Sequence, residues 1–251
     1  MLDGFLHYIV AFSRAQPLYR TRIRLRLVDH AFCIKLRQHH FKDGKGIFAM
    51  KIYDISQEVF GCVVFPGDPA PARERISTME DGALYNLTAF SMCAHNGTHI
   101  DAPYHFIKDG KTVDELSLSK TVGMAYVAQE EGILTATDAV RILQAAKNAH
   151  PEAEKRILVG GKVTVGEDAA RTFAEAGIYL LGNESQTVGL ENAPMLVHQI
   201  LLSREVVLLE GIRLGEVPTG VYLLCAAPLA LGGSDGAPCR ALLIELKNEP
   251  Y

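Results

Sequence analysis

The stretch HNGTHIDAPYH, which begins at His95, constrains this chain more than any other part of its sequence. In a helix, His95 and His99 would share a face, but Asp101 would lie about 240° around the axis from His95, and Pro103 would interrupt the hydrogen bonding. In a strand, these residues and His105 would all point the same way, yet a straight strand of this length would span about 33 Å. We therefore expect the chain to fold back and gather the four polar side chains in one compact site.

Two dipeptides in this stretch are typical of turns, Asn96-Gly97 and Ala102-Pro103. Imidazole nitrogens and a carboxylate oxygen at short range are the ligands of zinc, and they also suit manganese or iron(II). The alternative is a loop of polar residues that are satisfied independently. Small turn residues separate the four side chains and no Lys or Arg lies between them, which favours a metal site.

Composition narrows the class of protein. The chain has 251 residues, of which 48% are hydrophobic and 22% charged, enough for a substantial core. No apolar run approaches the ~20 residues of a membrane-spanning helix. The net charge of -4 argues against a nucleic-acid partner. The sequence shows no signal-peptide pattern, so we expect a cytoplasmic protein. Its cysteines show no C-x-x-C spacing, which predicts free thiols at Cys33, Cys62, Cys93, Cys225 and Cys239.

Charge separates residues 1–49 from the rest of the chain. This segment has six Arg and three Lys against three Asp, a net charge of +6, whereas residues 50–251 carry -10. A basic arm and a transit peptide are two interpretations, although the three aspartates fit a transit peptide poorly. In a third, translation starts at Met50 and the DGKGIFA before it is a translated ribosome-binding site. We expect a disordered or mis-annotated extension over 1–49 and the functional domain over 50–251.

Strand-like and helical patterns alternate from Met50 onward. The strand-like runs are MKIYDIS, GCVVF, YNLTAFSMCAH, MAYVAQ, RILVGG, GIYLLGN, EVVLLEG, GVYLLCAAPL and RALLIEL. Helical periodicity covers residues 135–149, 165–177 and 192–204, with Thr137 as the expected N-cap of the first helix. No repeat or long linker divides this region, which predicts a single α/β domain.

Four motifs follow one another along the chain in the same order as in one family of proteins. HNGTHIDAPYH matches H-x-G-T-H-x-D-x-P-x-H, FPGDP provides a P-G-D turn, HQILLSREVVLLEG contains H-x-x-L-L followed by a strand and a glutamate, and PLALGGSDGAPCRALLIE ends the series. In these motifs the chain resembles the cyclase-like metal-dependent hydrolases, which include bacterial kynurenine formamidase and isatin hydrolase. The resemblance spans 50–251 and implies a swivelling β/β/α fold with a mixed sheet, a homo-oligomer (dimer or tetramer), and one or two divalent ions, Zn²⁺ or Mn²⁺.

The resemblance also implies roles for individual residues. His95, His99 and Asp101 match the metal ligands of the first motif, and His198 and Glu210 match a second pair of ligands. Without the resemblance, a lone histidine such as His198 on an aliphatic helix would be interpreted as structural. His105 matches the histidine that transfers protons. Two departures, Asn183 and Gly189, replace aspartates of many relatives, and Phe65 stands where another aromatic residue is common, so the metal chemistry is better defined than the substrate.

The expected reaction is hydrolysis of a small amide, above all an aryl formamide such as N-formylkynurenine. A divalent cation lowers the pKa of its water from about 15.7 to near 7, so that metal-bound hydroxide can attack the carbonyl. His105 would protonate the departing amine, and Glu210 would orient or deprotonate the water if it is not solely a ligand. The alternatives are hydrolysis of a cyclic amide such as isatin, cyclisation or dehydration of a carbonyl compound in the same scaffold, and a non-catalytic metal-binding protein.

Overall fold

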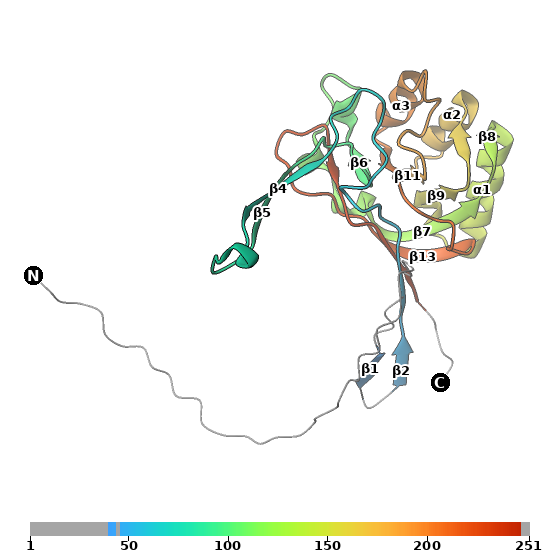
Figure 1. Ribbon diagram of the computed structural model, residues 1–251. Coiled ribbons are helices and arrows are strands. Elements are labelled where there is room, and N and C mark those ends of the chain that lie inside the picture. The colour runs from blue at the N-terminus through green and yellow to red at the C-terminus, as the bar shows by residue number, and fades with distance from the viewer. Residues whose placement is uncertain (1–39, 44–45, 247–251) are drawn as a thin grey trace, which may run out of the picture. The chain divides into compact units, whose positions relative to one another are not determined.

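A nine-stranded mixed sheet carries the core in the computed structural model, which describes residues 40–43 and 46–246 (Figure 1). The strand order is β14-β6-β12-β11-β9-β7-β13-β15-β3. Strands β12, β11, β9 and β7 are parallel, and antiparallel strands continue the sheet on both sides. In sheet order the strands are β14 (Gly236–Pro238), β6 (His99–Asp101), β12 (Val207–Glu210), β11 (Leu180–Asn183), β9 (Arg156–Gly160), β7 (Val122–Gln129), β13 (Gly220–Cys225), β15 (Leu242–Glu245) and β3 (Lys51–Asp54). The predicted mixed sheet is confirmed.

Three helices cover one face of this sheet: α1 (Ala136–Ala149), α2 (Glu167–Glu175) and α3 (Met195–Leu202) (Figure 1). They bury Ile142, Phe173 and Leu201 in one hydrophobic cluster with side chains of the parallel strands. The opposite face of the sheet packs on a second cluster that includes Ile100 and Leu214. Because both faces are covered, all residues of β9, β11 and β12 are buried, as is typical of parallel strands.

The start of α1 differs from the sequence prediction. Thr135, rather than Thr137, is the N-cap, and its hydroxyl accepts a hydrogen bond from the backbone N–H of Asp138. The Asp138 side chain accepts the backbone N–H of Thr135 in return, at 3.0 Å. This reciprocal pair is a capping box, which requires an acceptor side chain three residues after the cap and so selects the first of the two threonines.

One predicted strand is absent. GCVVF forms no strand, because the backbone N–H of Val63 donates to the side chain of Gln57 instead of to a neighbouring strand. Phe65 then enters a turn in which its carbonyl accepts the N–H of Asp68. The apolar run is thus a loop, and Phe65 lines the pocket described below.

Among the described residues, six short strands form pairs outside the main sheet. β4 (Ala72–Ser77) and β5 (Leu87–Ser91) are antiparallel, as are β1 (His40–Asp43) and β2 (Gly46–Ala49), whereas β8 (Gly132–Leu134) and β10 (Val163–Val165) are parallel. Single 3-10 turns occur at Met79–Asp81, Pro103–His105, Val113–Glu115, Leu118–Lys120 and Ala153–Lys155. Residues 1–39, which contain most of the predicted extension, lie outside the described residues. Within the described ranges, no helix is long and apolar enough to cross a membrane.

Candidate metal centre

Strand β6 places two polar side chains on the same face of the sheet. His99 and Asp101 are its first and last residues, so both point to one side, while Ile100 between them enters the core on the other. β12 is antiparallel to β6 and pairs Glu210 with His99. Residues directly opposite across an antiparallel pair share a face. The register therefore brings three of the predicted site residues together and buries each to 2% exposure or less.

The turn before β6 brings His95 back to this cluster. Gly97 has a φ of +67°, and a Cβ atom at this position would lie 3.2 Å from the Cβ of Cys62, so the turn requires glycine. His95 Nδ1 then lies 2.8 Å from Asp101 Oδ1. The expected turn at Asn96-Gly97 is thus present, and it explains how two side chains six positions apart come into contact.

Helix α3 contributes His198 from the other side of the cluster. Its Nδ1 lies 2.8 Å from the carbonyl oxygen of Pro194, one turn earlier. The other ring nitrogen, Nε2, lies 3.2 Å from Glu210 Oε1 and 3.6 Å from Asp101 Oδ2. His198 is 2% exposed, whereas Gln199, the other polar residue of α3, faces solvent.

The hydrogen bonds fix which nitrogen of each ring faces the cluster. A carbonyl oxygen can only accept, so Nδ1 of His99 carries the hydrogen that it donates to Gly97 O at 3.0 Å, and Nδ1 of His198 carries the one that it donates to Pro194. In the neutral rings, both Nε2 atoms therefore direct lone pairs at carboxylate oxygens. A nitrogen lone pair and a carboxylate oxygen repel each other. A positive charge must therefore lie between them, either a proton on each ring or a bound cation.

Unpaired buried atoms indicate that a metal fits. His99 Nε2 lies 3.2 Å from Asp101 Oδ1 and 3.5 Å from Glu210 Oε2, but neither contact has hydrogen-bond geometry. Among the described residues, neither His99 Nε2 nor Asp101 Oδ2 has a hydrogen-bond partner. Buried polar atoms are rarely left unpaired in proteins. The described residues contain three groups of potential ligands. Two of them share Asp101, one with His95 and His99 and one with His198 and Glu210, whereas the third consists of the less buried His95, His105 and Asp235.

The carboxylates shift the pKa values of the cluster. Burial lowers the pKa of His99 and of His198, but Asp101 and Glu210 outweigh this effect and raise the values to about 10 and about 9. Burial likewise opposes the charge of Asp101, yet His95 and His99 hold the pKa of this carboxyl well below its usual range. The cluster thus strongly favours positive charge beside its carboxylates, as expected of a cation site.

His105 lies beside this cluster, and within the described residues no hydrogen bond or ion pair joins it to Asp101 or Glu210. It ends the 3-10 turn Pro103–His105, and its ring stacks on that of His95 with centroids 4.0 Å apart. Burial is the main reason why the pKa of His105 is lowered, and the positive charges of His95 and His198 add to this effect against Asp101 and Asp235. His105 is consequently neutral near pH 7 and able to accept a proton.

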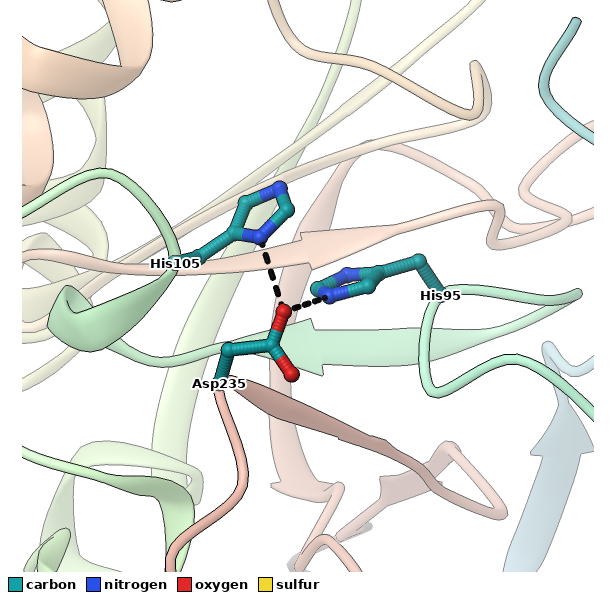
Figure 2. Close-up of side chains that lie close together, drawn as sticks. All are labelled: His95, His105 and Asp235. Carbon is teal, nitrogen blue, oxygen red and sulfur yellow. Dashed lines mark hydrogen bonds and ion pairs between the residues drawn. The ribbon is translucent and has the colours of Figure 1, made fainter. Parts of the chain in front are cut away.

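The sequence-based interpretation missed Asp235. This residue lies in the closing G-x-D-G-x-P motif, and its Oδ2 is 2.9 Å from His95 Nε2 and 3.1 Å from His105 Nδ1 (Figure 2). The motif itself was a usable signal, but only the pairing of β14 with β6 shows that it reaches the histidines.

A pocket of about 210 Å³ opens over the histidines. Phe65 and Phe106 provide aromatic rings, and the Phe106 ring lies 4.7 Å from that of His198. The lining combines these rings with the polar cluster and consists of Phe65, Asp68, His95, His99, His105, Phe106, Gln186, Thr187, Pro194, His198 and Glu210. A small cavity with an apolar wall and a polar floor suits a small aromatic substrate whose reacting group faces the cluster.

A cluster of three histidines and two carboxylates, four of which line a small pocket, is the site of a metal-dependent hydrolase. Comparison with known proteins agrees: residues 39–189 match the family described as "Putative cyclase". The chain is also 31% identical over 209 residues to the kynurenine formamidase of Erythrobacter litoralis, covering 79% of this chain and 95% of that protein. The chain belongs to the cyclase family.

Solved structures show the same fold. One, described as a potential metal-dependent hydrolase with cyclase activity, is 29% identical with a TM-score of 0.65, and the match covers 80% of this chain and 100% of the other. An isatin hydrolase bound to the product analogue thioisatinate is 20% identical with a TM-score of 0.66, covering 79% and 93% of the two chains. At 20% identity, the similarity to the isatin hydrolase shows a shared fold and nothing about the substrate. The expected membership among metal-dependent hydrolases of the cyclase type is confirmed.

Proposed function

We propose that this protein hydrolyses an aryl formamide, with N-formylkynurenine as the best candidate substrate. The observation that carries the proposal is the position of the neutral His105 beside a buried cation site in a pocket with aromatic walls. The similarity to a kynurenine formamidase over nearly its whole length supports the choice of substrate. The products would be an aryl amine and formate.

The metal would be held by five side chains. We assign His95, His99, Asp101, His198 and Glu210 as its ligands, with Asp101 shared between the two groups. Nitrogen and carboxylate ligands suit Zn²⁺ and Mn²⁺. Three neutral histidines and two carboxylates have a net charge of -2, which one divalent ion balances, and the two groups of ligands offer room for a second. When bound, such an ion lowers the pKa of a water molecule and polarises a carbonyl group.

The protein's own side chains would transfer the proton during the reaction. His105 donates its Nδ1 hydrogen to Asp235, so Nε2 has a free lone pair. It takes a proton from the attacking water and returns it to the amine nitrogen as the C–N bond breaks, because an amine leaves only when protonated. Glu210 accepts the backbone N–H of Val188 at 2.8 Å through Oε1 and faces His99 through Oε2. Both oxygens are engaged, which supports a ligand role rather than that of a base.

The test combines metal content with turnover. Elemental analysis of the purified protein should find about one or two equivalents of zinc or manganese per chain. The same sample should release formate from N-formylkynurenine, lose this activity with a chelator and regain it with added metal. Metal without turnover of formamides would refute the substrate, and hydrolysis of isatin would then assign the protein to cyclic amides. A folded protein that binds neither metal would refute the site.

We also propose that the protein is a homo-oligomer, through the β4–β5 hairpin. Within the described ranges these two strands pair only with each other, and Phe90 and Leu87 are exposed to 59% and 46%. Leu84 between the strands is 95% exposed. A two-stranded hairpin is marginally stable by itself, and clustered apolar surface marks an interface. Light scattering should give the mass of a dimer or tetramer, and Leu84→Ser with Phe90→Ser should reduce it to that of one chain. A monomeric wild type would refute the proposal.

A further inference from the structure

Asp235 joins two histidines that have different tasks in the proposed reaction. Its Oδ2 accepts hydrogen bonds from His95 Nε2 at 2.9 Å and from His105 Nδ1 at 3.1 Å (Figure 2). His95 is assigned as a metal ligand and His105 as the proton carrier. Figure 2 shows both rings converging on the same carboxylate oxygen.

The backbone around Asp235 is fixed on both sides. The carbonyl of Asp235 accepts the N–H of Ala102 at 2.9 Å, and the carbonyl of Ser234 accepts that of Val113 at 2.8 Å. Both hydrogen bonds lead to the segment that carries His105. The carboxylate is therefore held in register with the histidines by the fold, and its position does not depend on the side-chain contacts alone.

Gly236 allows β14 to approach the His95 ring. A Cβ atom at this position would lie 2.7 Å from His95 Cε1 and 2.8 Å from the carbonyl oxygen of Ile100. Both distances are too short for any side chain, so β14 reaches the ring only because this residue is glycine. The D-G pair of the motif thus has two functions: the aspartate receives the histidines and the glycine makes room for one of them.

The hydrogen bond to Asp235 determines which nitrogen His95 offers to the metal. Both neighbours of the ring are carboxylates, which only accept: Asp101 lies 2.8 Å from Nδ1 and Asp235 lies 2.9 Å from Nε2. Asp101 belongs to both groups of ligands, so a metal bound there would take the Nδ1 lone pair, and the hydrogen on Nε2 would remain as the one donated to Asp235. A carboxylate that holds the outer nitrogen of a ligand histidine orients the ring and makes it a stronger ligand. The same reasoning leaves Nε2 of His105 as the nitrogen that exchanges protons.

We propose that Asp235 is a positioning residue that orients the metal ligand His95 and the proton carrier His105 through one oxygen atom. Within the described ranges, the contacts of Asp235 Oδ2 with the site are the hydrogen bonds to these two rings. The part that concerns His105 rests on the function proposed above, whereas the part that concerns His95 requires only that the site binds a divalent ion.

The first experiment measures metal affinity and needs no substrate. Competition with a zinc indicator should show that Asp235→Ala weakens Zn²⁺ binding by about 10–100-fold. Asp235→Asn should fall between the wild type and Asp235→Ala, because the amide oxygen accepts hydrogen bonds but has no charge. Ser234→Ala is the matched control: it removes the hydrogen bonds from Ser234 Oγ to Gly236 O at 2.8 Å and to Asp235 Oδ1 at 3.5 Å, but leaves Asp235 Oδ2 and its two histidine partners in place. Equal losses in Asp235→Ala and Ser234→Ala would overturn the proposal, as would unchanged affinity in Asp235→Ala.

The second experiment separates the two histidines by a double-mutant cycle at saturating metal. Asp235→Ala should reduce kcat by about 10-fold or more in the wild type and have little further effect when His105 is already Ala. The loss of metal affinity caused by Asp235→Ala should be the same in the His105→Ala variant, because this loss arises through His95. Additive losses of kcat would overturn the link to His105. If the wild type hydrolyses no formamide, the proposed function fails while the affinity experiment still decides the link to His95. Thermal unfolding of each variant verifies that it is folded.

Discussion

His99 and Glu210 lie directly opposite each other across β6 and β12, and His99 Nε2 is 3.5 Å from Glu210 Oε2. They are 111 positions apart in the sequence, so only the sheet register makes them neighbours. Of the two groups of ligands that share Asp101, the first comes from one short segment, and the second adds His198 of α3 and Glu210 of β12. The site is therefore complete only when the central sheet has formed.

Glu210→Gln should lower the metal content of the protein. The amide keeps the shape of the side chain but loses the charge that faces His99 and His198. Ligands of a structural or catalytic metal must be deprotonated, and an amide is a poor substitute. Elemental analysis after dialysis should show fewer bound equivalents than in the wild type. Glu167→Gln on the exposed face of α2 is the control and should retain wild-type content. Full retention in Glu210→Gln would exclude a ligand role.

His105→Ala should separate metal binding from turnover. Its Nδ1 contacts Asp235, and its ring stacks on that of His95. It belongs to the less buried group of potential ligands with His95 and Asp235, and to neither of the two groups that share Asp101. We expect nearly unchanged metal content and a decrease in kcat of ~10²-fold or more, because the departing amine loses its proton donor. Single-turnover assays and elemental analysis on one sample measure both quantities. Loss of the metal would instead identify His105 as a ligand.

Much of this site follows from local sequence. The alternation of His99 and Asp101 predicts a shared face, and the Asn96-Gly97 pair predicts the turn that returns His95. His198 needed the family resemblance, because a histidine on an apolar helix has the same pattern whether it binds a metal or not. Asp235 could not be assigned, since its partners depend on the pairing of β14 with β6. The predicted strand over GCVVF was wrong for the same reason: the backbone N–H of Val63 bonds to the Gln57 side chain instead of to a neighbouring strand, and the local sequence does not reveal this contact.

Metal binding should release protons. In the metal-free protein, His99 and His198 have pKa values of about 10 and about 9, so both are protonated at pH 7, and a metal binds only neutral imidazole. Calorimetric titrations in buffers of different ionisation enthalpy should therefore detect at least two protons released per site near pH 7. Burial lowers the pKa of the third histidine ligand, His95, but hydrogen bonds to Asp101 and Asp235 outweigh this effect and raise the pKa. The apparent affinity should rise with pH up to about 9 or 10. An affinity that is independent of pH with no proton release would contradict the assigned ligands.

The stability of the metal-free protein should change in the opposite direction. A group whose pKa is raised on folding stabilises the protein fully below its unfolded pKa, about 6.5 for histidine, and this contribution disappears as the pH rises through the folded value. For His198 the folded value is about 9. Thermal unfolding in the presence of a chelator should thus show a Tm that falls between about pH 7 and pH 10. With metal the Tm should fall less, because the cation replaces the protons.

Gly236→Ala should weaken metal binding without removing any polar group. The added Cβ would lie 2.7 Å from His95 Cε1 and 2.8 Å from a backbone oxygen, so the ring or β14 must move, and His95 must leave the position in which Nδ1 faces Asp101. We expect zinc affinity to fall by about 10-fold or more, in line with loss of ligand orientation. Gly232→Ala is a closely matched control, because its Cβ would meet only Asp114, at 3.9 Å. If the two variants bind zinc equally well, close packing of β14 against His95 is not needed for the site.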